Sequence, residues 1–151
     1  MLSVYTDGSA HERACLPGGW AFAVVRADEL LAERCGGERS TTNNVMELHA
    51  ALAGLREVQA RGWHVGETVE LVSDSRVTLD VAAGVWRARR DVELSEAVRA
   101  AFLALGAQAR WVRGHSDDRW NDYVDGLAHE AKQALVPERV KARAAARRER
   151  A

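Results

Sequence analysis

The order in which strand-like and helix-like segments follow one another is the strongest constraint on how this chain can fold. Three short apolar segments, at residues 2–6, 20–25 and 30–35, precede the first helical pattern. Their length and their Val and aromatic content predict β-strands, and residues 10–17 are expected to form a loop between the first two. Apolar residues then recur every three or four positions through residues 45–61, which predicts a helix that Gly62 ends.

After this helix, strands and helices alternate. Residues 68–72 and 109–112 are predicted strands, and residues 75–85, 94–105 and 120–135 are predicted helices. The order is β-β-β-α-β-α-α-β-α, with an antiparallel start followed by strands that alternate with helices. It predicts an α/β fold in which a mixed sheet carries helices on its faces.

Composition limits the class of protein and its location. The chain has 151 residues, of which 47% are hydrophobic, so we expect one folded domain with a sizeable core. No run of 18 apolar residues and no secretion signal is visible, which argues against a membrane protein. Cys15 and Cys35 form no CxxC pair, so a zinc site is not expected, and two such thiols suit a reducing cytoplasm.

Charge is unevenly distributed along the chain. The formal net charge is -1, yet residues 137–151 contain six basic and two acidic residues. Pro137 should end the preceding helix, and the arginines beyond it fall on one helical stripe with little apolar surface opposite. We therefore expect a folded domain at residues 1–136 and a basic C-terminal tail at residues 137–151, forming a frayed or mobile helix.

Four carboxylates stand at strand ends or helix starts. Asp7 follows the first predicted strand, Asp74 follows the fourth, and Glu47 and Asp125 lie near the starts of two helices. Each has a local explanation. Glu47 can belong to a capping box with Asn44 as the N-cap, Asp74 can be an N-cap, Asp7 can sit in a turn, and Asp125 can favour the positive end of a helix.

Taken together, the four carboxylates indicate a metal site. Strand ends and helix starts can meet at one edge of a sheet, and carboxylates held within a few ångströms of one another need a cation to stay ionised. Hard oxygen ligands suit Mg²⁺ or Mn²⁺. Two such ions, about 3.5 to 4 Å apart, can clamp the attacking and leaving oxygens of a phosphodiester.

The motifs also carry a resemblance. YTDGS, TTNNVMELHAAL, LVSDS, WVRGH and WNDYVDGLAHEA occur in this order. From about residue 2 to 135 the chain resembles the ribonuclease H type 1 family. The resemblance implies a five-stranded mixed sheet whose middle strands carry Asp7 and Asp74. It also implies an endonuclease that depends on Mg²⁺ and hydrolyses the RNA strand of RNA/DNA hybrids, leaving 3′-hydroxyl and 5′-phosphate ends.

The resemblance assigns roles to single residues. Asp7 would bridge two Mg²⁺ ions, for which Mn²⁺ could substitute. Asp125 would hold the ion that activates water, and Glu47 and Asp74 would hold the ion that faces the leaving 3′ oxygen. His115, ten residues before Asp125, would assist proton transfer or product release. The alternative for His115 is an ordinary solvated side chain in a polar loop.

Substrate contacts are implied at the start of the first helix. Asn43 and Asn44 match residues that contact the two strands of the hybrid, and Thr42 matches one that helps to grip a DNA phosphate. Helix capping is the alternative for the asparagines. The basic neighbour usual in the family two positions before Thr42 is Ser40 here.

The chain departs from the family pattern after the SDS helix. Many members carry an extra basic, Trp-rich helix and loop there, whereas here residues 84–90 lead directly to the next helix. Trp86, Arg87, Arg89 and Arg90 would be a reduced version that binds the hybrid, with the basic tail supplying part of the missing grip. Core packing for Trp86 and a solvated turn for the arginines are the alternatives.

The resulting hypothesis is a cytoplasmic, monomeric ribonuclease H that acts on RNA/DNA hybrid duplexes. Two other classes remain open from the sequence. One is a junction resolvase or transposase-like nuclease of the same fold, against which the TTNNVMEL segment and the Gly-His loop argue. The other is a nucleic-acid-binding module without catalysis, which the loss of one carboxylate would have favoured.

Overall fold

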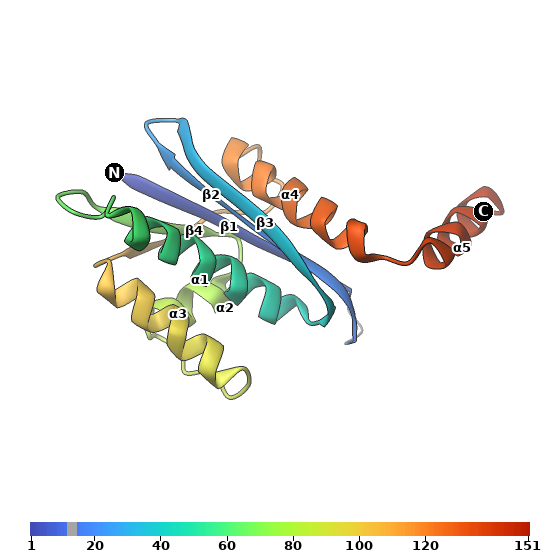
Figure 1. Ribbon diagram of the computed structural model, residues 1–151, viewed down its shortest axis with the longest axis horizontal. Coiled ribbons are helices and arrows are strands. Elements are labelled where there is room, and N and C mark those ends of the chain that lie inside the picture. The colour runs from blue at the N-terminus through green and yellow to red at the C-terminus, as the bar shows by residue number, and fades with distance from the viewer. Residues whose placement is uncertain (12–14) are drawn as a thin grey trace.

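The structure is a computed structural model, and it describes the chain except for residues 12–14 and the side chains of residues 138–140. Five strands form one sheet in the order β3-β2-β1-β4-β5 (Figure 1). They are β1 (Leu2–Ala10), β2 (Leu16–Arg26), β3 (Glu29–Thr41), β4 (Val69–Ser73) and β5 (Gln108–Trp111). The β1–β2 and β2–β3 pairs are antiparallel, whereas β1–β4 and β4–β5 are parallel. The predicted mixed sheet is confirmed, with β1 at its centre.

Helices lie on both faces of this sheet. They are α1 (Asn43–Arg61), α2 (Arg76–Ala83), α3 (Val92–Ala104) and α4 (Arg119–Leu135), and α5 (Glu138–Glu149) follows them at the C-terminal end. In Figure 1, α1, α2 and α3 lie on one side of the strands and α4 lies on the other. The sheet is therefore covered on both faces, which explains why nearly all residues of β2 and all residues of β4 are buried.

Successive residues of the central strands feed two separate cores. Val4 of β1 and Leu71 of β4 belong to the apolar cluster that α1 and α3 complete. Their neighbours Tyr5 and Val72 belong to a second cluster, which includes Val124 of α4. This division follows from the two-residue period of a strand, which points consecutive side chains to opposite faces.

Glycines let both helical layers approach the sheet closely. A Cβ atom at Gly19 of β2 would lie 2.1 Å from the Ala128 carbonyl oxygen and 2.6 Å from the Lys132 backbone nitrogen, both in α4. On the opposite face, a Cβ atom at Gly54 of α1 would lie 2.6 Å from Val4 Cγ1. Larger side chains at these positions would hold the helices away from the strands.

The strand prediction was wrong around the first hairpin. The predicted strand at residues 2–6 continues to Ala10, so Asp7 lies within β1 and is not a turn residue. The expected loop at residues 10–17 is shorter because β2 begins at Leu16 and Ala10 still pairs with Gly18. Pairing between β1 and β2 continues through Gly8 and Gly18, which extends both strands beyond their predicted ends. The part of that loop at residues 12–14 lies outside the described residues.

The helix caps also differ from the expectations. Thr42, not Asn44, is the N-cap of α1, and its hydroxyl accepts a hydrogen bond from the Val45 backbone nitrogen at 3.2 Å. Glu47 therefore lies two residues too late for a capping box, whose third position is Val45. Ser75 caps α2 in the place considered for Asp74. Helix capping therefore does not explain the presence of Glu47 or Asp74.

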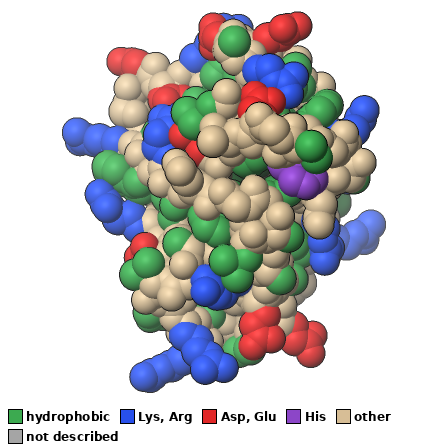
Figure 2. All heavy atoms as spheres, turned by 90° about the vertical axis from the view of Figure 1, so that its left-hand side faces the viewer, with side chains coloured by type: hydrophobic (Ala, Val, Ile, Leu, Met, Phe, Trp, Pro, Cys, Tyr) green, Lys and Arg blue, Asp and Glu red, His purple; other side chains and the backbone are tan. Residues whose placement is uncertain are grey.

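The C-terminal tail is helical and extends away from the sheet. Helix α5 follows Pro137 and lies beyond the end of α4 in Figure 1. Figure 2 shows the opposite end of the molecule, where Lys and Arg side chains are interspersed with Asp and Glu. Mobility of the tail stays a prediction. Among the residues that the structure describes, no helix combines the length and apolar character needed to span a bilayer.

We predict that Gly19→Ala destabilises the protein because its methyl group would collide with the backbone of α4. The expected loss is about 1–3 kcal/mol in the free energy of unfolding, measured by urea denaturation. Gly126→Ala is the matched control, since nothing lies within 4 Å of a Cβ there. In a helix this change should raise stability by up to about 1 kcal/mol. Equal stability of the two variants would contradict the close packing of α4.

Candidate active site

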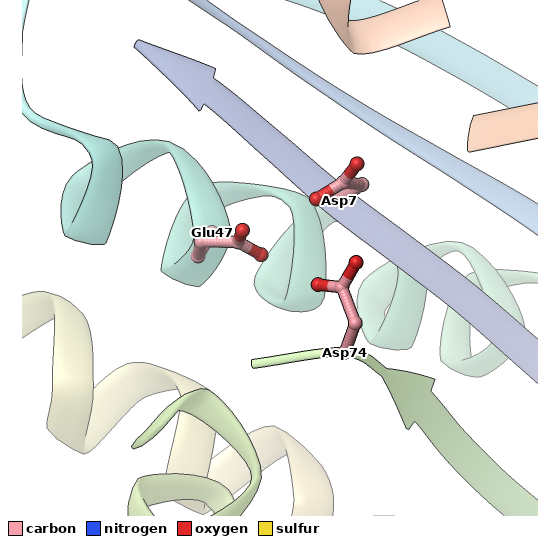
Figure 3. A group of neighbouring side chains, drawn as sticks. All are labelled: Asp7, Glu47 and Asp74. Atoms are coloured by element: carbon pink, nitrogen blue, oxygen red, sulfur yellow. The ribbon is translucent and has the colours of Figure 1, made fainter. Parts of the chain in front are cut away.

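Three carboxylates from separate elements converge beside the central strand. Asp7 comes from β1, Glu47 from α1 and Asp74 from the residue directly after β4. One oxygen of each lies within 4.8 Å of the others (Figure 3). Because β1 and β4 are parallel neighbours, Asp7 and Asp74 project from the same region of the sheet, and α1 brings Glu47 across from its first two turns.

The contact between β1 and α1 depends on the residue after Asp7. A Cβ atom at Gly8 would lie 2.4 Å from the Glu47 backbone nitrogen and 2.6 Å from the Met46 carbonyl carbon. Any other side chain would separate the strand from the helix at the point where the two carboxylates meet. The close packing of β1 against α1 therefore requires the glycine of the YTDGS motif.

Burial makes the negative charges of this cluster costly. Asp7 and Glu47 are 3% and 5% exposed. Burial, followed by the charge of Glu47, raises the pKa of Asp7 to about 10. Burial likewise raises the pKa of Glu47 to about 8, although a hydrogen bond with Asp7 works in the opposite direction. Burial also raises the pKa of Asp74. Without a cation, the cluster would therefore retain protons at neutral pH.

The donor set fits a divalent cation. Glu47 Oε2 is buried and has no hydrogen-bond partner in the described part of the chain. A cation among the three carboxylates would give this oxygen a partner and offset the repulsion that raises the pKa values. Carboxylate oxygens are the ligands that Mg²⁺ and Mn²⁺ prefer. Asp7, Glu47 and Asp74 are thus the residues that could hold a metal.

The fourth carboxylate approaches from the other face of the sheet. Asp125 lies on α4 and does not belong to the tight group of three. It is nevertheless close to them, since a hydrogen bond with Asp125 contributes to the raised pKa of Asp7. Its charge also raises the pKa values of Glu47 and Asp74. The structure therefore brings all four predicted carboxylates to one region.

His115 lies in the loop before α4. Its side chain is exposed, and its backbone has a φ of 53°, in the left-handed region that non-glycine residues seldom adopt. The charge of His115 lowers the pKa of Asp74, which places the imidazole on the open side of the carboxylate cluster. This position is compatible with the proton-transfer role implied by the family resemblance.

Two residues that sequence reasoning missed hold Asp74 in place. Asn121 of α4 is 1% exposed, and its side chain hydrogen-bonds the Asp74 carboxyl group, which lowers the pKa of Asp74. Trp111 Nε1 donates a hydrogen bond to the Asp74 carbonyl oxygen at 3.0 Å. The available signal for Asn121 was its spacing, because it precedes Asp125 by one helical turn.

Most of the predicted substrate contacts share one pocket of about 470 Å³. It lies between the start of α1 and residues 84–91, a segment without a helix. We call it the first pocket, and the predicted contacts that line it are Thr42, Asn44, Trp86, Arg89 and Arg90. Trp86 is 50% exposed, so core packing is excluded for it.

The remaining two predicted contacts lie elsewhere. Arg87 lines an adjacent pocket on the other side of Trp86. Asn43 faces β1, where its Oδ1 accepts a hydrogen bond from the Ala10 backbone nitrogen at 3.3 Å. Asn44 Nδ2 donates to Asp91 Oδ2 at 3.3 Å, which ties the start of α1 to the segment before α3. The expected contacts thus form one continuous surface with Asn43 at its border.

Comparison with known proteins gives the family. The sequence model of RNase H matches residues 1–133, nearly the whole chain before the tail. The chain belongs to the RNase H family. The predicted resemblance to its type 1 members is confirmed, and the chain is therefore related to enzymes throughout its sheet and its first four helices.

Individual relatives agree with this assignment. The chain is 34% identical to the ribonuclease H of Treponema pallidum, over 86% of this chain and 89% of that protein. It is 32% identical to the ribonuclease H of Parvibaculum lavamentivorans, over 91% and 95% respectively. The structure of LC11-RNase H1 in complex with an RNA/DNA hybrid shares the fold. Its TM-score is 0.75 at 24% identity, over 90% of this chain and all of that one.

The raised pKa values predict how pH affects the stability of this RNase H without metal. A folded protein whose carboxyl groups have raised pKa values binds more protons than the unfolded chain. Stability should therefore fall as pH rises from the ordinary carboxyl pKa of about 4 toward the raised values of Asp7 and Glu47. Thermal unfolding in a chelator should show a lower midpoint at pH 8 than at pH 5.

Two controls isolate the cluster. Adding Mg²⁺ should raise the unfolding midpoint more at pH 8 than at pH 5, because ionised carboxylates bind it better. Asp7→Asn removes one charge and should reduce the loss of stability between the two pH values. If stability in the chelator rises over this range, the account of the cluster is wrong.

Proposed function

We propose that this RNase H is an endonuclease that hydrolyses the RNA strand of RNA/DNA hybrid duplexes. The observation that carries the proposal is the convergence of Asp7, Glu47 and Asp74 beside the central strand, with Asp125 close to them. A structural relative bound to an RNA/DNA hybrid supports the same substrate class. The expected products carry 3′-hydroxyl and 5′-phosphate ends.

The carboxylates would act by holding two divalent ions. Asp7 would contact both, Glu47 and Asp74 would complete the site on the side of the leaving oxygen, and Asp125 would complete the other. When bound, Mg²⁺, or Mn²⁺ in its place, supplies positive charge that stabilises the attacking and leaving oxygens of phosphodiester hydrolysis. The protein supplies a rigid, largely buried frame in which the carboxylates need no rearrangement.

Other side chains would position groups or move protons. Asn121 and Trp111 fix Asp74 from two directions, through its carboxyl group and its carbonyl oxygen. The exposed imidazole of His115 stands on the open side of the cluster, where it can take up or release a proton near the leaving group. Asn43, Asn44 and Thr42 present polar groups at the border of the carboxylate cluster. There they can meet the phosphates and 2′-hydroxyl groups by which a hybrid is recognised.

The setting in which the enzyme acts is part of the proposal. Cys15 and Cys35 are both free and exposed, which suits a reducing cytoplasm. The long edge strand β3 carries Glu29, Glu33, Arg34, Glu38 and Arg39. Charged side chains on an edge disfavour pairing between sheets of two molecules, which supports a monomer.

We predict that the purified protein nicks a labelled RNA/DNA hybrid with Mg²⁺ or Mn²⁺ and is inactive in a chelator. Duplex DNA and duplex RNA of the same sequence should remain intact. Asp7→Asn should lower the cleavage rate by several orders of magnitude, because Asp7 stands at the centre of the cluster. An active Asp7→Asn variant would refute the role given to this residue, and cleavage of duplex DNA would refute the substrate class.

We propose that the basic tail increases the affinity of the protein for the hybrid. Residues 138–151 contain α5 (Glu138–Glu149), which lies beyond the end of α4 and carries Arg143, Arg147 and Arg148. Deleting these residues should raise the Michaelis constant and flatten its dependence on salt, because fewer phosphate contacts release fewer counterions. Turnover should remain close to that of the full chain.

A milder variant checks the same idea. Replacing the three arginines by glutamine keeps the tail but lowers its net charge from +4 to +1, and it should reproduce most of the effect of the deletion. Folding of both variants can be compared by circular dichroism. An unchanged Michaelis constant at low and high salt in both variants would exclude a role of the tail in binding.

A further inference from the structure

A second pocket lies directly beside the first one, on the other side of Trp86. It has a volume of about 350 Å³ and is formed where α2 ends and α3 begins. Val81, Trp86, Ala88 and Val92 give it apolar walls. This volume lies within the range of about 300–1,000 Å³ that is typical of small-molecule sites. Nothing in the catalytic scheme above uses it.

The rim of the second pocket is unusually apolar for a protein surface. Trp86 is 50% exposed and Val92 43%, and both line the pocket. Val85, which is 76% exposed, is the neighbour of Trp86 in the chain. At the base of the pocket, Ser95 is 5% exposed, and no hydrogen-bond partner of its hydroxyl is found among the described residues. Clustered exposed apolar side chains around a hollow indicate a binding site.

Positive charge accompanies these apolar walls. Arg87 and Arg99 line the second pocket, and Arg89 and Arg90 line the first. Glu96 is the single acidic residue among the residues lining the second pocket. The combination of an exposed indole, apolar walls and guanidinium groups suits a ligand in which a flat ring is linked to negatively charged groups.

The two pockets adjoin. Val81, Trp86 and Ala88 line both of them, so a polymer strand bound in the first pocket has to pass only Trp86 to place its next unit in the second. Nucleic acid has the required chemistry, since its bases stack on aromatic rings and its phosphates pair with arginine. A base inside a duplex cannot enter, because its faces are stacked and its edge is paired.

We propose that the second pocket receives an unpaired nucleobase from a single-stranded extension next to the hybrid. The base stacks on Trp86, Arg87 and Arg99 meet the adjoining phosphates, and the Ser95 hydroxyl, unpartnered in the described part of the chain, is available to a polar edge of the base. This proposal rests on the proposed function, since the duplex beside the extension is its substrate.

The test compares hybrids with and without an extension. The full-length Asp7→Asn protein with Mg²⁺ binds but should not cut, so fluorescence anisotropy can give dissociation constants. A short single-stranded DNA extension at one end of the hybrid should tighten binding roughly fivefold or more, as expected for one stacked base. The same extension at the other end should have no effect. An RNA extension of the same length should give a similar gain, because the contacts are to the base and the phosphates. A gain from neither extension would overturn the proposal.

Substitutions separate the two pockets. Val92→Phe fills the second pocket and Arg99→Gln removes one of its charges, while neither residue lines the first pocket. Both variants should abolish the gain from the extension and leave the affinity for the blunt hybrid unchanged. Arg90→Gln, in the first pocket, is the matched control and should weaken both hybrids by the same factor. A 2-aminopurine at the first unpaired position should be quenched by the protein, but not by the Val92→Phe variant.

Failure of this proposal can be told apart from failure of the proposed function. If the blunt hybrid does not bind, the proposed function is wrong. If the blunt hybrid binds but no extension tightens binding, the second pocket does not receive a base. A gain that persists in both Val92→Phe and Arg99→Gln would overturn the proposal in the same way.

Discussion

The contact between the central strand and the start of α1 determines the rest of the site. Gly8 lets β1 run so close to α1 that a single added carbon would lie 2.4 Å from the backbone of Glu47. This contact places a strand carboxylate against a helix carboxylate in a buried position, where both are costly to ionise. The two apolar cores on either face of the sheet stabilise the arrangement, and parallel pairing of β1 with β4 adds Asp74.

Much of this arrangement could be predicted from the sequence. The two-residue and 3.6-residue periods identified five strands and the packed helices, and the motif order gave the family. The four carboxylates were identified because no local role explained all of them together. Pairing between strands decides where a strand ends, and for this reason Asp7 was wrongly placed just after the first strand rather than within β1.

What the sequence did not reveal depends on contacts between distant segments. The Asn121 side chain hydrogen-bonds the Asp74 carboxyl group, and Trp111 donates a hydrogen bond to the Asp74 carbonyl oxygen. In the sequence, the two residues look like ordinary members of a helix and a strand. Thr42 rather than Asn44 is the N-cap of α1 because β3 ends at Thr41, directly before it. The two pockets around Trp86 require three elements to meet, so no local pattern could have indicated them. The metal-binding and substrate-binding roles of these residues remain proposals.

Anomalous diffraction from crystals soaked in Mn²⁺ is the most direct test of the central claim that the fold assembles a cation site from separate elements. The account predicts an anomalous peak within coordination distance of Asp7, Glu47 and Asp74. It also predicts that the peak is absent in crystals of the Asp7→Asn variant. Crystals of the unaltered protein in which the three carboxylates point apart, or in which Mn²⁺ binds only elsewhere, would contradict it.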